Sequence, residues 1–290
     1  MGQAGLSGGL AATAGTSALA AEGGAPPAPP KIRVLETGIS ATSYAEACEA
    51  IAAWGRAGRA AYICACNVHT VMEARRDPEY ARVLNEAAMA TPDGMPLVWA
   101  LRRLGAPKQE RVYGPDLLLE FAARAAGRPD LASYFYGGAE GVAGELARNL
   151  AERFPGFRTA GHESPPFREL TGEEDTAAVE RINASGANVL WVGLGAPKQE
   201  RWMAAHLGRV RPVMIGVGAA FDFLTGRTRQ APRWMMRAGL EWAFRLAVEP
   251  RRLWRRYLFN NPGFAWRVGW QVVLNHCGNR GIECQGGRMR

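Results

Sequence analysis

Residues 189–200 read VLWVGLGAPKQE, an apolar run followed by a glycine-containing turn and then a polar stretch. The run Val189–Gly193 has the length and composition of a buried strand. The turn after it contains Pro197, a residue that is pre-organised for the first turn of a helix. A strand, a tight turn and a helix in this order form the unit from which parallel sheets with helices on both faces are built.

The same pattern recurs on both sides of this stretch. Four further apolar runs end in turn residues and read as strands, namely residues 61–66, 87–91, 133–137 and 213–217. Helical patterns lie between the runs, at residues 44–54, 95–104, 115–126, 141–154, 174–185 and 199–207. We therefore predict an α/β protein with a Rossmann-like, mainly parallel sheet, helices on both faces and a C-terminal basic helical appendage.

Composition divides the chain into three parts. Residues 1–30 are an Ala/Gly/Pro-rich leader, predicted to be disordered, and residues 31–225 form the α/β catalytic domain. Residues 226–290 contain thirteen arginines, no lysine and three acidic residues, a net charge of +10, although the whole chain carries only +8. A positive charge concentrated in one segment predicts an anionic partner, which can be phosphate, nucleic acid or an anionic membrane.

The appendage contains an amphipathic pattern in residues 251–259. At helical spacing, Arg251, Arg252, Arg255 and Arg256 lie on one face, while Leu253, Trp254, Tyr257 and Leu258 lie on the other. Such a basic, aromatic helix is typical of proteins that lie on anionic membranes. An ordinary helix docked on the body is the alternative, and both can hold at once. No run of 18 apolar residues is present, so a membrane-spanning helix is not predicted.

In parallel sheets, ligands bind beyond the carboxyl ends of the strands, so the residues after each strand are the candidates for a site. Asp93, within Thr91–Gly94, follows one strand and precedes a helix, where it is either an N-cap or a general base. The loop 193–200 exposes amides that favour anions, and Gln199 could hydrogen-bond a base or sugar. A simple strand-to-helix turn is the alternative for this loop.

Several function classes lack their sequence signatures. GxGxxG is absent, which disfavours a nicotinamide-dependent dehydrogenase, and no Walker A sequence is present. The four histidines have no ligand spacing and no two aspartates lie two residues apart, so no metal site is predicted. A nucleic-acid-binding protein that uses the Arg/Trp tail is the alternative function, disfavoured by a nearly neutral body without RNA or DNA motifs.

The ordered set of motifs resembles the WecG/TagA/CpsF family of bacterial glycosyltransferases. The matching stretches, spread over residues 32–257, are Asn67, 91–94, 111–117, Gly137–Gly138, 193–200, 216–222, 229–232 and 239–246. The resemblance implies inverting, metal-independent transfer from a UDP-sugar to a polyprenyl-diphosphate-linked saccharide in cell-surface polysaccharide synthesis. The transferred sugar would be N-acetylmannosamine, its uronic acid or glucose. It also implies a protein bound peripherally to the inner face of the cell membrane, without a cofactor.

The resemblance also implies roles for individual residues. Asp93 falls on the family's proposed general base, Asn67 lies beside the acceptor, and Gln199 lies near the nucleotide. Arg111, Gly137 and Glu200 are likewise assigned to substrate binding, because they stand in matching motifs. The appendage arginines that close over the diphosphate are matched by spacing to Arg245, Arg252 and Arg255.

Two departures from the family pattern are visible. Some members have Thr two residues before the Asn, where this chain has Ala65, so that an acceptor contact by that hydroxyl is lost. The arginine of the APxW stretch is replaced by Gln230.

The expected partners, as the resemblance implies them, are a UDP-sugar, the lipid-linked saccharide and an anionic membrane surface, and not nucleic acid. The sequence does not decide the oligomeric state, and a second copy of the chain, as in a homo-oligomer, is kept as one possible partner.

Overall fold

The computed structural model describes residues 25–285, and side chains as far as residue 276. Most of the predicted leader, residues 1–24, lies outside the described residues. The main sheet has six parallel strands in the order β4-β3-β8-β7-β5-β6. Their bounds are β3 Tyr62–Cys66, β4 Met89–Pro92, β5 Ser133–Gly137, β6 Thr159–Glu163, β7 Val189–Gly193 and β8 Val213–Gly216. A separate antiparallel hairpin precedes them, formed by β1 (Lys31–Val34) and β2 (Thr37–Ser40).

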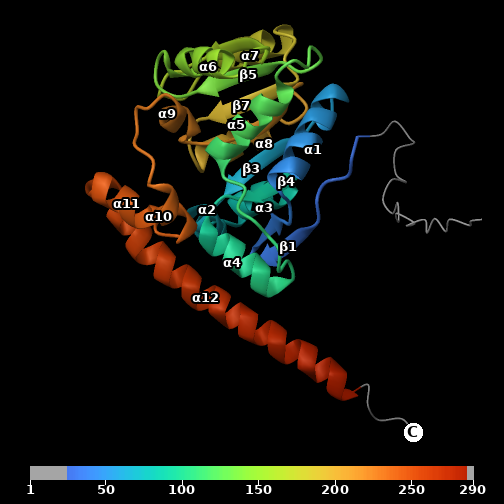
Figure 1. Cartoon of the computed structure of the whole chain (residues 1–290), viewed down its shortest axis with the longest axis vertical. Coiled ribbons are helices and arrows are strands. Elements are labelled where there is room, and N and C mark those ends of the chain that lie inside the picture. The colour runs from blue at the N-terminus through green and yellow to red at the C-terminus, as the bar shows by residue number, and fades with distance from the viewer. Residues whose placement is uncertain (1–24, 286–290) are drawn as a thin grey trace, which may run out of the picture.

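Helices cover both faces of the sheet, as Figure 1 shows. Within the body they are α1 Tyr44–Arg56, α2 Val68–Arg76, α3 Pro78–Glu86, α4 Met95–Leu104, α5 Gly114–Ala125, α6 Val142–Arg153, α7 Gly172–Ala184, α8 Lys198–Ala205 and α9 Ala220–Leu224. Alternate strand residues enter two different cores: Ile63 and Trp191 pack with α1, α5 and α6 on one face. Cys64 and Cys66 pack with α2, α3, α7 and α8 on the other. This alternation follows from the two-residue repeat of a strand. The parallel sheet with helices on both faces confirms the predicted α/β class.

The five predicted strands are present, but other elements escaped the sequence reading. Strand β6 has a half-exposed, polar sequence, TAGHE, at the edge of the sheet, so it carries no apolar run. Helices α2 and α3 lie between two predicted strands and are closely spaced, with Asp77 both ending α2 and capping α3. Patterns that identify buried elements are weak at edges and in short helices.

The appendage consists of α10 (Arg233–Arg237), α11 (Glu241–Val248) and α12 (Pro250–Gln285). Helix α12 lies along α2 and α4 and extends beyond the body (Figure 1). Two side-chain contacts fix it: Arg76 donates to Asn260 at 2.5 Å, and the Gln271 amide bonds the backbones of Leu35 and Arg33 at 2.9 Å each. The predicted helix of residues 251–259 is therefore the start of a much longer one that docks on the body. Across the described residues, no helix is long and apolar enough to cross a membrane.

Candidate active site

A cavity of about 510 Å³ lies between the carboxyl ends of β3 and β4 and the appendage. The body contributes Asn67, His69 and Asp93 together with residues of α4. The appendage contributes Glu241, Trp242, Arg245 and a face of α12. The body and the appendage each supply only part of the cavity wall, and the appendage covers the carboxyl ends of β3 and β4.

Asp93 stands directly after β4 and lines the cavity. Its Oδ1 accepts the Gly114 amide, the first residue of α5, at 2.8 Å. The N-cap of its own helix, α4, is Gly94, without a side-chain cap, so the N-cap alternative for α4 is wrong. Burial raises the pKa of Asp93 above its ordinary value of 3.8, and the Glu241 carboxylate adds to the rise, although Arg111 and hydrogen bonds from Gly114 and Asn67 oppose it. A fixed carboxyl with a raised pKa is suited to accept a proton near neutral pH.

Arg111 joins the Asp93 loop to the appendage. Its Nε donates to the backbone carbonyl of Asp93, and its Nη2 lies 2.6 Å from Glu241 Oε2 at the start of α11. The guanidinium also stacks 4.1 Å from the centre of the Tyr113 ring. The two side chains of the ion pair are only 14% and 20% exposed, so water screens the pair weakly. Arg111 therefore holds the appendage against the loop that carries the candidate base.

Asn67 and His69 begin α2 beside Asp93. Asn67 is the N-cap, and its Oδ1 accepts from the His69 and Thr70 amides at 3.0 and 3.4 Å. Burial lowers the pKa of His69 to about 3, helped by the nearby positive charges of Arg256 and Arg76. His69 is consequently a neutral wall of the cavity at physiological pH. Sequence reading missed it, because a lone histidine without ligand spacing gave no signal.

The structure separates the appendage arginines into two groups. Arg245 and Arg256 line the cavity, and the Nε of each is buried without a hydrogen-bond partner among the described residues. Burial lowers the pKa of Arg256, and the like charges of Arg245 and Arg252 lower it further. Arg252 instead pairs with Glu249 and is 65% exposed, while Arg255 is exposed and stacks on Trp254. Thus Arg252 and Arg255, selected by spacing, do not line the cavity, whereas Arg256, which adjoins them, does.

Gln199 and Glu200 are buried away from the cavity, 3% and 0% exposed. Gln199 Oε1 accepts the amides of Gly195 and Gly218 at 3.2 and 3.0 Å, and its Nε2 donates to Glu200 Oε1 at 2.8 Å. Glu200 Oε2 accepts from the Tyr80 hydroxyl at 3.2 Å. These bonds tie together the loops that follow β7 and β8. Contact between either side chain and a nucleotide stays a prediction, since both are already engaged within the protein.

Gly137 ends β5 where it meets β7. Its φ is +136°, and a Cβ there would lie 2.5 Å from the carbonyl carbon of Gly193, so only glycine fits. Near this point a second hollow of about 390 Å³ is lined by Tyr136, Leu194, Lys198, Trp202, Asp175 and residues 165–166 and 168–172. The structure therefore places Gly137 in a strand contact beside this hollow, and apart from the Asp93 cavity.

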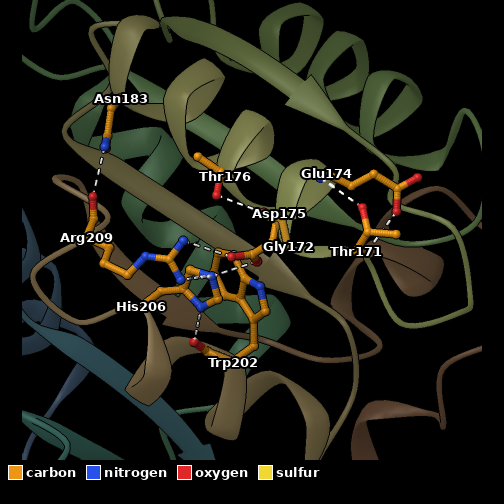
Figure 2. Close-up of polar contacts among 9 residues, drawn as sticks. All are labelled: Thr171, Gly172, Glu174, Asp175, Thr176, Asn183, Trp202, His206 and Arg209. Carbon is orange, nitrogen blue, oxygen red and sulfur yellow. Dashed lines mark hydrogen bonds and ion pairs between the residues drawn. The ribbon is translucent and has the colours of Figure 1, made fainter.

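A polar network supports the wall of the second hollow (Figure 2). Trp202 stacks between Tyr136 and His206, with ring centres 4.9 and 4.1 Å apart. Asp175 holds His206 at 2.8 Å and Arg209 at 2.9 Å (Figure 2), which ties α7 to the end of α8. His206, held by Asp175, keeps the Trp202 ring in place through stacking, and the same Trp202 side chain lines the second hollow.

Comparisons with known proteins identify the family. The family described as "Glycosyl transferase WecG/TagA/CpsF family" matches residues 32–277. A protein of Bacillus spizizenii called N-acetylglucosaminyldiphosphoundecaprenol N-acetyl-beta-D-mannosaminyltransferase is 31% identical over 201 residues, which cover 69% of this chain and 76% of the relative. A Bacillus subtilis protein of the same description is 29% identical over 210 residues, covering 72% and 78%.

Proposed function

The chain belongs to the WecG/TagA/CpsF family of glycosyltransferases and is a hexosyltransferase, and we propose that it moves N-acetylmannosamine from a UDP-sugar to a polyprenyl-diphosphate-linked saccharide. The names of the two Bacillus relatives support both the sugar and the lipid-linked acceptor. The observation that carries the proposal is the cavity itself, which is lined both by a carboxyl with a raised pKa, Asp93, and by two arginines whose buried Nε atoms have no hydrogen-bond partner among the described residues.

Asp93 is the general base in this proposal. An acceptor hydroxyl attacks the anomeric carbon of the donor while the bond to the UDP oxygen breaks, and the hydroxyl proton passes to the Asp93 carboxylate. Attack from the side opposite to the leaving group inverts the anomeric centre. The hydrogen bond from Gly114 fixes the carboxyl, so it is positioned before the substrate arrives. Asn67, at the start of α2, is placed to orient the acceptor sugar beside it.

Arg245 and Arg256 supply positive charge to the diphosphate groups that both substrates carry. Negative charge grows on the diphosphate that leaves the donor, and guanidinium groups bind phosphate through paired hydrogen bonds. Both side chains line the cavity, and the buried Nε of each has no hydrogen-bond partner among the described residues. Arg111, already paired with Glu241, acts by holding the appendage in place. Contributions from Arg252 and Arg255 require a movement of the helix and remain a prediction.

The outer surface of the appendage supports binding to the inner face of an anionic membrane. Arg251, Arg252 and Arg255 are exposed near the start of α12. Large apolar side chains of the same helix are also exposed, namely Trp254, Leu258, Phe259, Trp266, Trp270, Val273 and Leu274. Exposed cations beside exposed aromatic rings suit the interfacial region of an anionic bilayer. Docking there would bring the cavity to its lipid-linked acceptor.

UDP release measures the proposed reaction directly. The assay uses a panel of UDP-sugars, an N-acetylglucosaminyl-diphosphate-lipid acceptor and EDTA, and compares the wild type with Asp93→Asn. We expect acceptor-dependent release from UDP-N-acetylmannosamine that persists in EDTA and is lost in the variant. Release from a different UDP-sugar alone would correct the donor, and full activity in Asp93→Asn would remove Asp93 as the base. Activity that disappears with EDTA would contradict a metal-independent reaction.

A further inference from the structure

The lining of the cavity changes character along one face of α12. In chain order, the lining residues are Arg256, Tyr257, Asn260, Asn261, Phe264, Ala265, Val268, Gly269 and Val272. The first four are polar or carry a polar group, and the last five are apolar. Their spacing of three and four residues puts them on one side of the helix. The cavity therefore has a polar part next to Arg256 and an apolar part farther along α12.

The facing wall of the apolar part comes from α4. Met95, Pro96, Trp99 and Ala100 of this helix line the cavity, and Arg103 follows in the last turn with an exposed side chain. Trp99 is 45% exposed, although it is one of the largest apolar side chains near the site. The turn between α10 and α11 closes against it, since a Cβ on Gly239 would lie 2.5 Å from the indole ring. Between the described residues of α4 and the second half of the α12 lining there is no acidic side chain.

We propose that this apolar part binds the first isoprene units of the acceptor's polyprenyl chain. The assignment rests on the proposed function, because it is the acceptor that joins a sugar, a diphosphate and a hydrocarbon chain in that order. The cavity offers the three matching kinds of surface: the Asp93 carboxyl, the guanidinium of Arg256, and the apolar residues that follow Arg256 along α12. An amphiphile can satisfy both parts in only one direction, with its sugar toward Asp93. The hydrocarbon chain would thus help to orient the acceptor hydroxyl.

The prediction is tested with acceptors that differ only in their tails. N-acetylglucosaminyl diphosphates carrying dimethylallyl, geranyl, farnesyl or geranylgeranyl groups are assayed with the full chain, without vesicles or detergent. Each buried CH₂ strengthens binding roughly fourfold, so KM should fall by at least about tenfold from the dimethylallyl to the farnesyl acceptor. Beyond the end of the cavity, further isoprene units should lower KM little.

Substitutions in the cavity wall locate the effect. Gly269 lines the cavity, and a Cβ there meets no atom within 4 Å, so Gly269→Glu adds a charge at the cavity wall without a steric clash. We expect about a tenfold higher KM for the farnesyl acceptor and an unchanged KM for the dimethylallyl acceptor. Asn275→Glu is the matched control, because Asn275 is on the same helix, is exposed and does not line the cavity. Ala265→Glu, also exposed and lining, repeats the test at a second position.

Three outcomes would overturn the assignment. Transfer with the same KM for all four tails would remove the tail site and leave the reaction intact. A tail dependence that appears only with vesicles, or that Gly269→Glu and Ala265→Glu both leave unchanged, would place the tail in the membrane. No transfer to any acceptor from any UDP-sugar would refute the proposed function, and the assignment with it.

Discussion

One buried network of the body and two arginines of the appendage bond their polar atoms in opposite ways. In the body, Tyr80, Glu200 and Gln199 form a buried chain of hydrogen bonds that ends on the amides of Gly195 and Gly218. In the appendage, the buried Nε atoms of Arg245 and Arg256 have no hydrogen-bond partner among the described residues. Buried polar groups in proteins are normally paired, so unpaired ones need an explanation. Four buried oxygens of the body, on Glu36, Thr37, Thr91 and Thr159, are unpaired within the described part of the chain as well, but none of these residues lines the cavity. We therefore propose that the body network stabilises the fold and that the two arginines, which do line the cavity, bind a ligand.

The body and the appendage also differ in how far their tryptophan side chains are exposed. In the body, Trp54 and Trp191 are fully buried, while Trp99, which lines the cavity, is 45% exposed. Trp234, Trp254, Trp266 and Trp270 of the appendage are between 43% and 74% exposed. Burial of such side chains contributes to stability, but exposure costs solubility unless a partner covers them. We therefore expect the appendage to bind a partner outside the chain, and the body to hold the loops of the site in place.

The largest effect is expected at the point where the two regions meet. Asp93→Asn keeps the size of the side chain and removes the base, so kcat should fall by about 10²–10⁴-fold while the melting temperature is kept. In the wild type, kcat/KM should rise with pH through an acidic limb whose midpoint lies above 3.8, because burial favours the protonated Asp93 and only the carboxylate accepts a proton. The limb should be absent from the residual activity of the variant. A wild-type limb at or below 3.8 would contradict the raised pKa.

The two groups of appendage arginines give the next largest effect. Arg256→Ala should lower kcat/KM by about 10²-fold, since it removes a donor from a buried anion site. Arg252→Ala is the matched control on the same helix and should change kcat/KM by less than about threefold, because its ion pair with Glu249 is solvent-exposed. The reverse order of the two variants would show that α12 turns when substrate binds. It would then restore Arg252 as the residue that contacts diphosphate.

His69 lies where the body meets the appendage, and it makes the stability of the folded protein fall at acidic pH. Its pKa is about 3 in the folded protein and about 6.5 in the unfolded chain, so the unfolded state takes up a proton first as the pH falls. The contribution of neutral His69 is fully present above pH 6.5 and is lost toward pH 3. At pH 5 the loss should be about 2 kcal/mol of unfolding free energy. Chemical denaturation at pH 7 and pH 5 should show a smaller pH difference for His69→Gln, and equal differences in both proteins would exclude this role.

The smallest effect is expected inside the body. Tyr80→Phe leaves Glu200 Oε2 without its donor and should cost about 1 kcal/mol, seen as a melting temperature lower by about 2–4 °C. The double variant Tyr80→Phe/Glu200→Gln should lose less than the two single variants together, because the residues act through one hydrogen bond. Strictly additive losses would show that the hydroxyl and the carboxyl contribute independently. KM for the acceptor should stay unchanged in Tyr80→Phe.

The sequence by itself determined five strands of the main sheet and indicated that ligands bind at the carboxyl ends of these strands. Buried parallel strands are short apolar runs, and their signal is local, so Val189–Gly193 and its neighbours could be read directly. The same local logic placed Asn67 and Asp93 after adjacent strands, and the family motifs gave them roles. Strand β6 could not be read, because an edge strand needs no apolar run. Its register against β5 comes from backbone pairing, which leaves no mark on side-chain pattern.

Only the tertiary structure decided which charged residues share the cavity. Arg255 and Arg256 are neighbours in sequence, yet a helix turns about 100° per residue, so the docking of α12 on α2 and α4 partly buries Arg256 and leaves Arg255 exposed. The ion pair of Arg111 and Glu241 joins residues 130 positions apart. Gln199 was placed near a nucleotide by its motif, but its partners Gly218 and Glu200 engage it inside the protein. Local sequence fixes which residues a helix or loop contains, and the packing of distant elements fixes what each side chain meets.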